Sequence, residues 1–194
     1  MDDRADALSM LATAEKEAGD EAASRAAIEA RVRLLDEAAS RARTPREAAA
    51  FDAMRAWAYQ DAGRPEEAVR MLEERTRQLP DDYEAYARLA QVLTALDPPR
   101  AVAPLRRAID LAYGPRRVRY LEQEVELHAK LGDAPSRVAA LRRLVEAHRA
   151  LAPGHADAAK RAKAEAQLAE AEAGGAARGP APGARPPAAS GAGR

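Results

Sequence analysis

Residues 80–115 read PDDYEAYARLAQVLTALDPPRAVAPLRRAIDLAYGP, with two apolar stripes between proline-marked breaks. Apolar side chains recur at intervals of three and four from Tyr83 to Leu93, which predicts an amphipathic helix. Asp82 precedes this stripe as a preferred N-cap, and the turn at Asp97 precedes a second stripe of the same kind. The segment therefore predicts a helical hairpin.

Turn-forming residues recur at regular intervals along the chain. Prolines lie 35, 35 and 38 residues apart, and a series of turn residues between them is spaced by 34 and 35. Helix-forming sequence flanks each mark, and such a period indicates stacked helical hairpins. The two series are Pro45, Pro80, Pro115 and Pro153, and Gly63, Asp97 and Gly132.

The composition agrees with an all-α fold. The 194 residues include 52 Ala and 27 Arg, no Cys and one Phe, so helix formers dominate strand formers. The lack of Cys excludes disulfides and thiolate metal sites. We find no signal peptide and no apolar run of about 18 residues, and therefore expect a cytoplasmic protein without a membrane segment. The Ala and Arg content suggests a GC-rich bacterial gene.

Four regions follow from the pattern. They are an irregular helical hairpin at 1–43, three hairpins at 45–152, a capping helix at 155–173 and a disordered Gly/Pro/Ala/Arg tail at 174–194. In the second region, Thr44 is the expected N-cap, Pro45 suits the first turn and Glu47 completes a capping box. This helix is expected to continue through Trp57 and to end at Gly63.

Residues 52–111 resemble the tetratricopeptide repeat family. The matching positions are Tyr86-x2-Leu89-Ala90-x2-Leu93 and Ala101-x3-Leu105-x2-Ala108, preceded by Ala56-x2-Tyr59, Gly63, Ala68-x3-Leu72 and Pro80. One residue is missing between the two halves of the first match, and the pattern is displaced over 116–152. The resemblance implies a right-handed superhelical stack whose first helices line a concave groove for peptides or partner helices. The alternative is a helical-hairpin array outside this family.

The resemblance also places candidate residues in that groove. They are Ala50, Ala53, Trp57, Gln60, Glu84, Ala87, Gln91, Thr94, Arg119, Glu122, Glu126 and Ala129. Trp57 would be a strong anchor for a partner if it faces the groove, and the alternative places it in the core. Members of the family that clamp chaperone carboxylates use paired Asn and Lys. This chain has no Asn and no Lys at the matched positions, which argues against that role.

The charge is unevenly distributed. Residues 1–97 carry 21 acids and 14 bases, a net of −7, whereas residues 98–194 carry 10 acids and 17 bases, a net of +7. A basic patch is predicted from Arg106, Arg107, Arg116, Arg117, Arg142 and Arg143, which raises the hypothesis of a nucleic acid or acidic partner. No aromatic residues interleave for base stacking, and arginine stems can simply cover a convex face. Self-association through the array ends or the opposite halves is a third hypothesis.

Catalytic chemistry has little support in the sequence. His148 and His155 lie seven apart across a Pro-Gly break, which is poor spacing for metal ligands, and His128 is remote from both. No phosphate loop or serine nucleophile motif is present. We expect no enzyme activity, cofactor or metal. The sequence favours a scaffold or adaptor that binds a protein partner in the groove, with a chaperone-like protein of bacterial secretion as the alternative.

Overall fold

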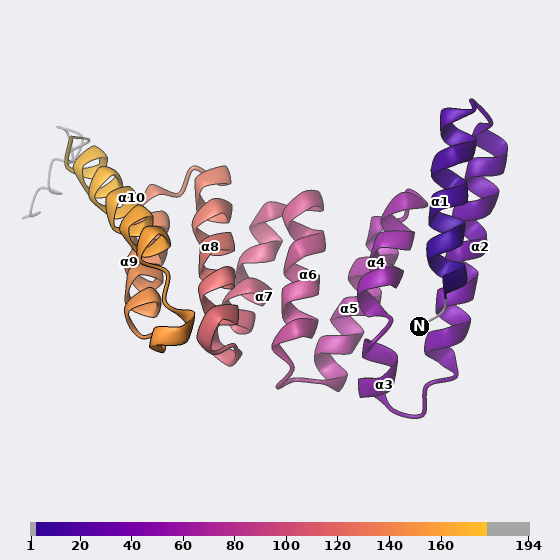
Figure 1. Cartoon of the computed structure of the whole chain (residues 1–194), viewed down its shortest axis with the longest axis horizontal. Helices are drawn as coiled ribbons and strands as arrows, with labels where there is room; N and C mark the ends of the chain where they lie inside the picture. Colours follow the sequence, from indigo (N-terminus) through magenta and orange to yellow (C-terminus); the bar gives the residue numbers. More distant parts are fainter. Residues whose placement is uncertain (1–2, 178–194) are drawn as a thin grey trace, which may run out of the picture.

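The computed structural model describes residues 3–177, and all regular structure in that range is helical. The elements are α1 (Asp3–Glu17), α2 (Glu21–Ser40), α3 (Pro45–Ala49), α4 (Asp52–Asp61), α5 (Pro65–Gln78), α6 (Tyr83–Leu96), α7 (Pro98–Leu111), α8 (Gly114–Lys130), α9 (Ala134–Arg149), η1 (Pro153–His155) and α10 (Ala158–Ala177). The predicted all-α solenoid is confirmed (Figure 1). Most of the predicted tail, from residue 178 on, lies outside the described residues.

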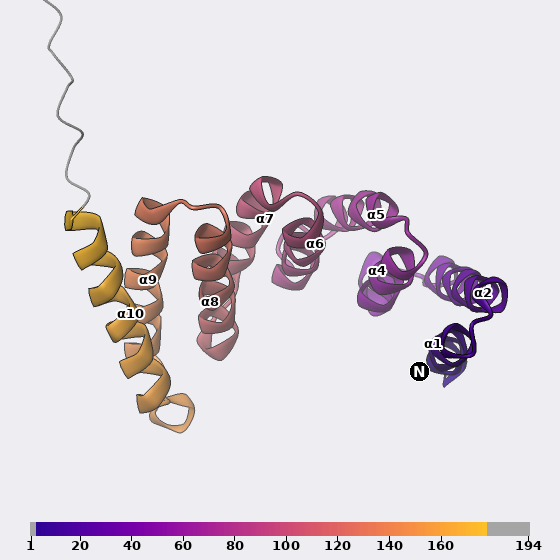
Figure 2. The same cartoon turned by 90° about the horizontal axis from the view of Figure 1, so that it is seen from above.

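The helices form a row of antiparallel pairs that bends into an arch. α1 pairs with α2, α4 with α5, α6 with α7 and α8 with α9, and α10 packs against α9. Figure 2 views the row from above, with α1, α4 and α6 on the inner side and α2, α5 and α7 on the outer side, and α8 and α9 side by side. The first helices of the first three of these pairs therefore line the concave side.

Alanines fill the joints between the helices. Ala58, Ala68, Ala101, Ala108 and Ala140 are completely buried. They lie in one continuous core with large residues such as Leu72, Leu105 and Leu141. The small side chains let neighbouring helices approach closely, and the large ones fill the space between them. Stability thus comes from contacts between neighbours in the array.

Three hairpin turns use the same backbone device. Gly19, Gly63 and Gly132 have φ of 84°, 70° and 68°, a left-handed conformation that favours glycine. In the second turn, the Gly63 N–H donates to the Gln60 carbonyl at 2.9 Å and the Arg64 N–H donates to the Tyr59 carbonyl at 2.8 Å. These bonds satisfy carbonyls at the end of the first helix. At the corresponding turn between α6 and α7, Asp97 has φ −148° and Pro98 restarts the helix instead.

The expectation of one helix from Pro45 to Gly63 is wrong, because the chain breaks between α3 and α4. The Thr44 cap does form, since its hydroxyl oxygen accepts the Glu47 N–H at 3.2 Å. After Ala49, the N–H groups of Ala50 and Phe51 donate to carbonyls only three residues back, which tightens the turn. Arg88 of α6 donates to the freed Ala49 carbonyl at 3.0 Å. A contact with the next hairpin therefore stabilises the break.

Candidate partner-binding groove

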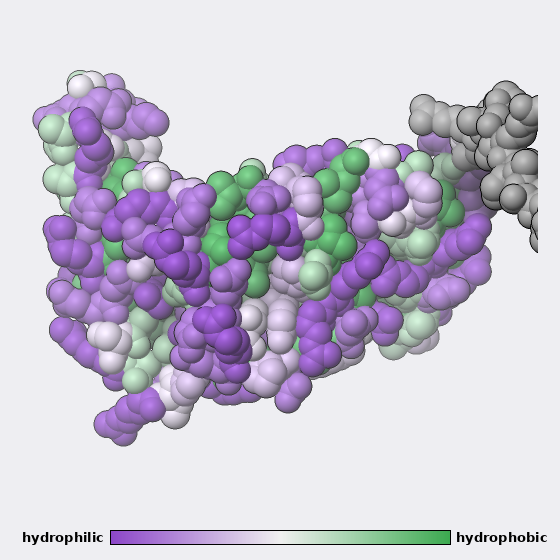
Figure 3. All heavy atoms as spheres, turned by 180° about the vertical axis from the view of Figure 1, so that it is seen from behind, coloured by the Kyte–Doolittle hydropathy of each residue, from purple (hydrophilic) through white to green (hydrophobic). Residues whose placement is uncertain are grey.

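Most of the exposed large apolar side chains lie on helices of the inner side of the arch. Among the described residues they are Met10, Leu11, Trp57, Leu96 and Tyr113. The first four lie on α1, α4 and α6, and Tyr113 lies in the turn before α8. The outer helices carry none within that range, and Figure 3 shows that hydrophilic residues cover most of their side. Grouped apolar exposure is typical of interaction surfaces.

Trp57 is a surface residue of α4. Its side chain is 50% exposed, whereas its neighbours Ala56 and Ala58 are buried at 3% and 0%. The two alanines turn toward the core, and Trp57 lies on another side of the helix. Of the two positions considered from the sequence, the core position does not apply.

A hollow of about 270 Å³ lies between α6 and α8. Its lining is Ala90, Gln91, Thr94, Leu105, Gln123, Glu126, Leu127 and Lys130. Lys130 crosses from α8 and donates its Nζ to the Thr94 carbonyl at 2.8 Å. The structure thus brings Gln91, Thr94 and Glu126, three of the predicted groove residues, around one partly apolar cavity.

Two further hollows continue along α8. One of about 360 Å³ separates α8 from α10 and is bordered by Glu122, Glu126, His148, Lys160 and Lys163. The other, of about 430 Å³, is bordered by Arg119 and Glu122. Within residues 3–177, Arg119, Glu122 and Glu126 form no ion pair, so these side chains can contact a partner without breaking an internal bond.

Other predicted groove residues are already engaged. Gln60 donates its amide to the Ala56 carbonyl of its own helix at 3.1 Å. Glu84 accepts from Arg88 at 2.6 Å and lies 3.8 Å from Arg116 of α8. The four alanines, Ala50, Ala53, Ala87 and Ala129, are exposed or half-buried and offer only a flat surface. Glu84 is therefore better placed to hold the hairpins together than to contact a ligand.

Five of the six arginines of the predicted basic patch are paired with acids of the same chain. Arg106 and Arg143 pair with Glu124, Arg107 with Asp81, Arg116 with Glu84 and Arg142 with Glu172. Arg117 has no such pair within residues 3–177. Phosphate binding needs cations that are available to the ligand. The pairing leaves little of this patch for nucleic acid.

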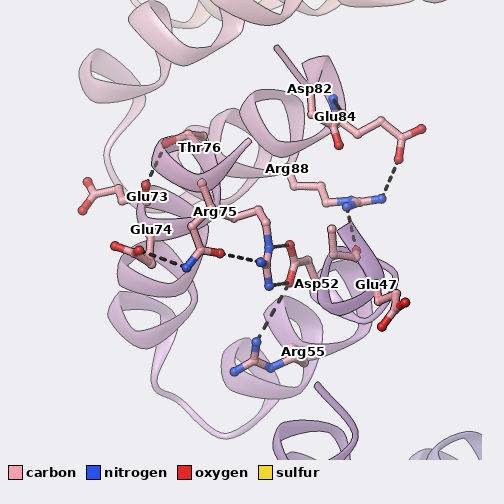
Figure 4. Close-up of polar contacts among 12 residues, drawn as sticks. Glu47, Asp52, Arg55, Glu73, Glu74, Arg75, Thr76, Asp82, Glu84 and Arg88 are labelled. Carbon is pink, nitrogen blue, oxygen red and sulfur yellow. Dashed lines mark hydrogen bonds and ion pairs between the residues drawn. The ribbon is translucent and has the colours of Figure 1, made fainter. Parts of the chain in front are cut away.

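Charged residues in the core were missed by sequence reasoning. Asp52 is fully buried and accepts from Arg75 at 2.7 Å (Nε–Oδ2) and 3.2 Å (Nη2–Oδ1), as Figure 4 shows. Arg55 lies 3.9 Å from the same carboxylate and 2.8 Å from Asp36 of α2. The sequence did contain one indication that Asp52 is buried, because Asp52 lies on the same side of the helix as the buried Tyr59. This network joins α2, α4 and α5, and its role is structural.

Between residues 3 and 177, no three His, Asp or Glu side chains lie close enough to hold a metal ion. In the same range, no helix is both long and apolar enough to cross a membrane.

Comparison with known proteins supports the fold. The tetratricopeptide repeat family model matches residues 48–92, within the arch just described. The chain is a tetratricopeptide-like repeat solenoid. Its resemblance to the family, first seen over residues 52–111, is thereby confirmed.

Solved structures share this repeat solenoid. One is a putative kinesin light chain from Podosopora anserina with nearly identical TPR-like repeats (19% identity, 92% of this chain and 90% of that chain covered, TM-score 0.58). Another is BtubC (BKLC) from P. vanneervenii (18% identity, 96% and 86% covered, TM-score 0.54). At such identities the likeness concerns the fold alone. No curated protein matches the chain in sequence.

Proposed function

We propose that this protein is a non-catalytic adaptor that binds a segment of a partner protein on the inner side of the arch. The repeat fold is that of protein-interaction scaffolds, which supports the general role. The observation that carries the specific assignment is the distribution of exposed large apolar side chains, four of which lie on inner helices and none on the described outer helices. Among them, Trp57 is of a residue type that often contributes strongly to the affinity of protein interfaces.

The groove suggests how a segment would bind. The half-exposed Trp57 is the apolar anchor, and the hollow between α6 and α8 accepts one apolar side chain. The amides of Gln91 and Gln123 border that hollow, and each offers both a donor and an acceptor to the backbone of the segment. The charged side chains of α8 then select the sequence that follows.

A capture experiment with matched variants tests this assignment. The protein is immobilised as wild type, as a groove variant (Trp57→Ala, Gln91→Ala, Glu126→Ala) and as a control (Glu66→Ala, Arg70→Ala). All three are first shown to be equally helical. The control substitutions are exposed and lie outside the groove. We expect one protein from a lysate of the source organism to bind the wild type and the control, and to be lost with the groove variant.

Two outcomes would contradict the proposal. Equal retention of the same proteins by the groove variant would place binding elsewhere on the molecule. Capture of nucleic acid that is lost as salt rises would instead indicate that the arginines on the outside bind phosphate despite their ion pairs.

A further inference from the structure

Helix α1 carries two apolar stripes. Ala5 and Ala12 are buried against α2, and Leu8 between them is half-buried. A second stripe runs along another side at the helical spacing of three, one and three residues. It consists of Ala7, Met10, Leu11 and Ala14, and all four are exposed, Met10 by 73% and Leu11 by 46%.

This stripe lies at an end of the array. α1 packs chiefly against α2 and stands at one end of the row in Figures 1 and 2. The other end is different, since α10 buries Ala164 and exposes no large apolar side chain within the described residues. The two ends are therefore not equivalent: within residues 3–177, α1 is the end helix that presents an apolar face without a partner.

We infer that a second copy of this chain covers the stripe, with the two α1 helices packed antiparallel about a two-fold axis between Met10 and Leu11. Along the stripe, the two large residues, Met10 and Leu11, lie in the middle and the two small alanines lie at the ends. The stripe is therefore symmetric in side-chain size about that point. Under such an axis, Met10 meets Leu11 of the second copy and Ala7 meets Ala14. A closed two-fold interface requires a surface that is complementary to itself in this way.

The size and charge of α1 determine how this dimer behaves. A single pair of 15-residue helices buries less than the roughly 1,200–2,000 Å² of a stable interface, so the dimer is weak. α1 carries four acids and two bases, a net of −2, which repels its copy. Added salt screens that repulsion and strengthens the dimer. Association through the oppositely charged halves of the chain would instead weaken with salt.

Sedimentation velocity of the whole chain tests the dimer over roughly 10 μM to 1 mM, where weak complexes dissociate. We expect a concentration-dependent dimer whose dissociation constant rises at least tenfold in Met10→Glu. Tyr113→Glu is the matched control, because it places the same charge on an exposed residue elsewhere, and it leaves the dimer intact. A monomer throughout, or a dimer that Met10→Glu leaves unchanged, overturns the inference.

Cysteine cross-linking tests the packing independently, since the chain has no Cys. With the axis between Met10 and Leu11, two copies of residue 7 lie about 10 Å apart along the helices. That is beyond the roughly 7 Å between Cα atoms that a disulfide spans. We therefore expect no disulfide dimer from Ala7→Cys or Ala14→Cys alone and an efficient one from their mixture. Cross-linking by either variant alone indicates parallel helices and overturns the arrangement.

Discussion

Asp52 shows how much of this fold depends on single residues. It is fully buried, whereas the other buried residues of α4 are Ala56, Ala58 and Tyr59, and Arg75 of the next helix binds both carboxylate oxygens. Desolvation of the two charges is costly and is offset only while both partners are present. The pair therefore links α4 and α5 only in the correct register.

Removing one partner should be much worse than removing both. We expect Asp52→Ala to lower the free energy of unfolding by about 3–5 kcal/mol, because it leaves the Arg75 guanidinium buried without its carboxylate. The double variant Asp52→Leu/Arg75→Met should recover much of that loss. Urea unfolding measures both values. A double variant that loses as much stability as the sum of its single changes would show no coupling between the two residues and would contradict this prediction.

Tyr59 makes stability sensitive to alkaline pH. Burial raises the pKa of its hydroxyl, and the hydrogen bond to Asp36 raises it further. As pH rises through the ordinary tyrosine pKa of about 10, the unfolded chain loses this proton first, so the free energy of unfolding falls. Burial also raises the pKa of Tyr120, with the same sign.

Substitution of these tyrosines should reduce that alkaline loss. We expect Tyr59→Phe to give a flatter dependence of the urea midpoint on pH above about 10 than the wild type. Tyr113→Phe, at an exposed tyrosine, is the control and should follow the wild type. An unchanged slope in Tyr59→Phe would contradict the assignment of this loss to Tyr59.

At the scale of elements, the recurring glycine turn explains part of the sequence period. Gly63→Ala should cost about 1–2 kcal/mol, because φ of 70° places a Cβ against the following carbonyl oxygen. Gly154→Ala is the matched control. That glycine also has open space around a new Cβ, but its φ is not in the left-handed region, so its substitution should be nearly neutral. Thermal unfolding of both variants decides the matter, and equal costs would contradict the argument.

Capping and turn residues made most helices predictable, whereas the break between α3 and α4 could not be foreseen. Asp82 and Thr44 act through neighbours two or three residues away, and such local signals are visible in a sequence. The break depends on Arg88, which is 39 residues from the carbonyl that it contacts. Such a contact between hairpins cannot be predicted from helix propensity, which depends only on local sequence.

The candidate site was predictable only in part, for the same reason. The family register predicted Gln91, Thr94 and Glu126 as groove residues, and in the structure all three border one cavity. The family register could not decide whether the Trp57 side chain lies in the core or on the surface, because the buried and the exposed sides of its helix adjoin each other. Nor could it reveal that Glu84 contacts Arg116 of the following hairpin. Charge pairs across hairpins depend on three-dimensional spacing.

At the scale of the whole molecule, stability should be local. We expect a chain ending at residue 156 to expose Val125 and Leu144, which line the space beside α10. Hydrogen exchange should then accelerate in α8 and α9 but not in α4 to α7, because each hairpin contacts only its neighbours. A chain ending at residue 177 is the control. Faster exchange throughout the array would show instead that the solenoid unfolds as one unit.

The buried alanines between the helices also set how strongly the arch is curved. Ala58, Ala101 and Ala140 are completely buried between helices, so a bulkier side chain at any of these positions would push the neighbouring helices apart. This displacement would change the angle between adjacent hairpins and thereby the width of the concave side, without altering any residue that a ligand touches. Substitution of a buried alanine can therefore change which ligands the concave side accepts, although the alanine itself contacts no ligand.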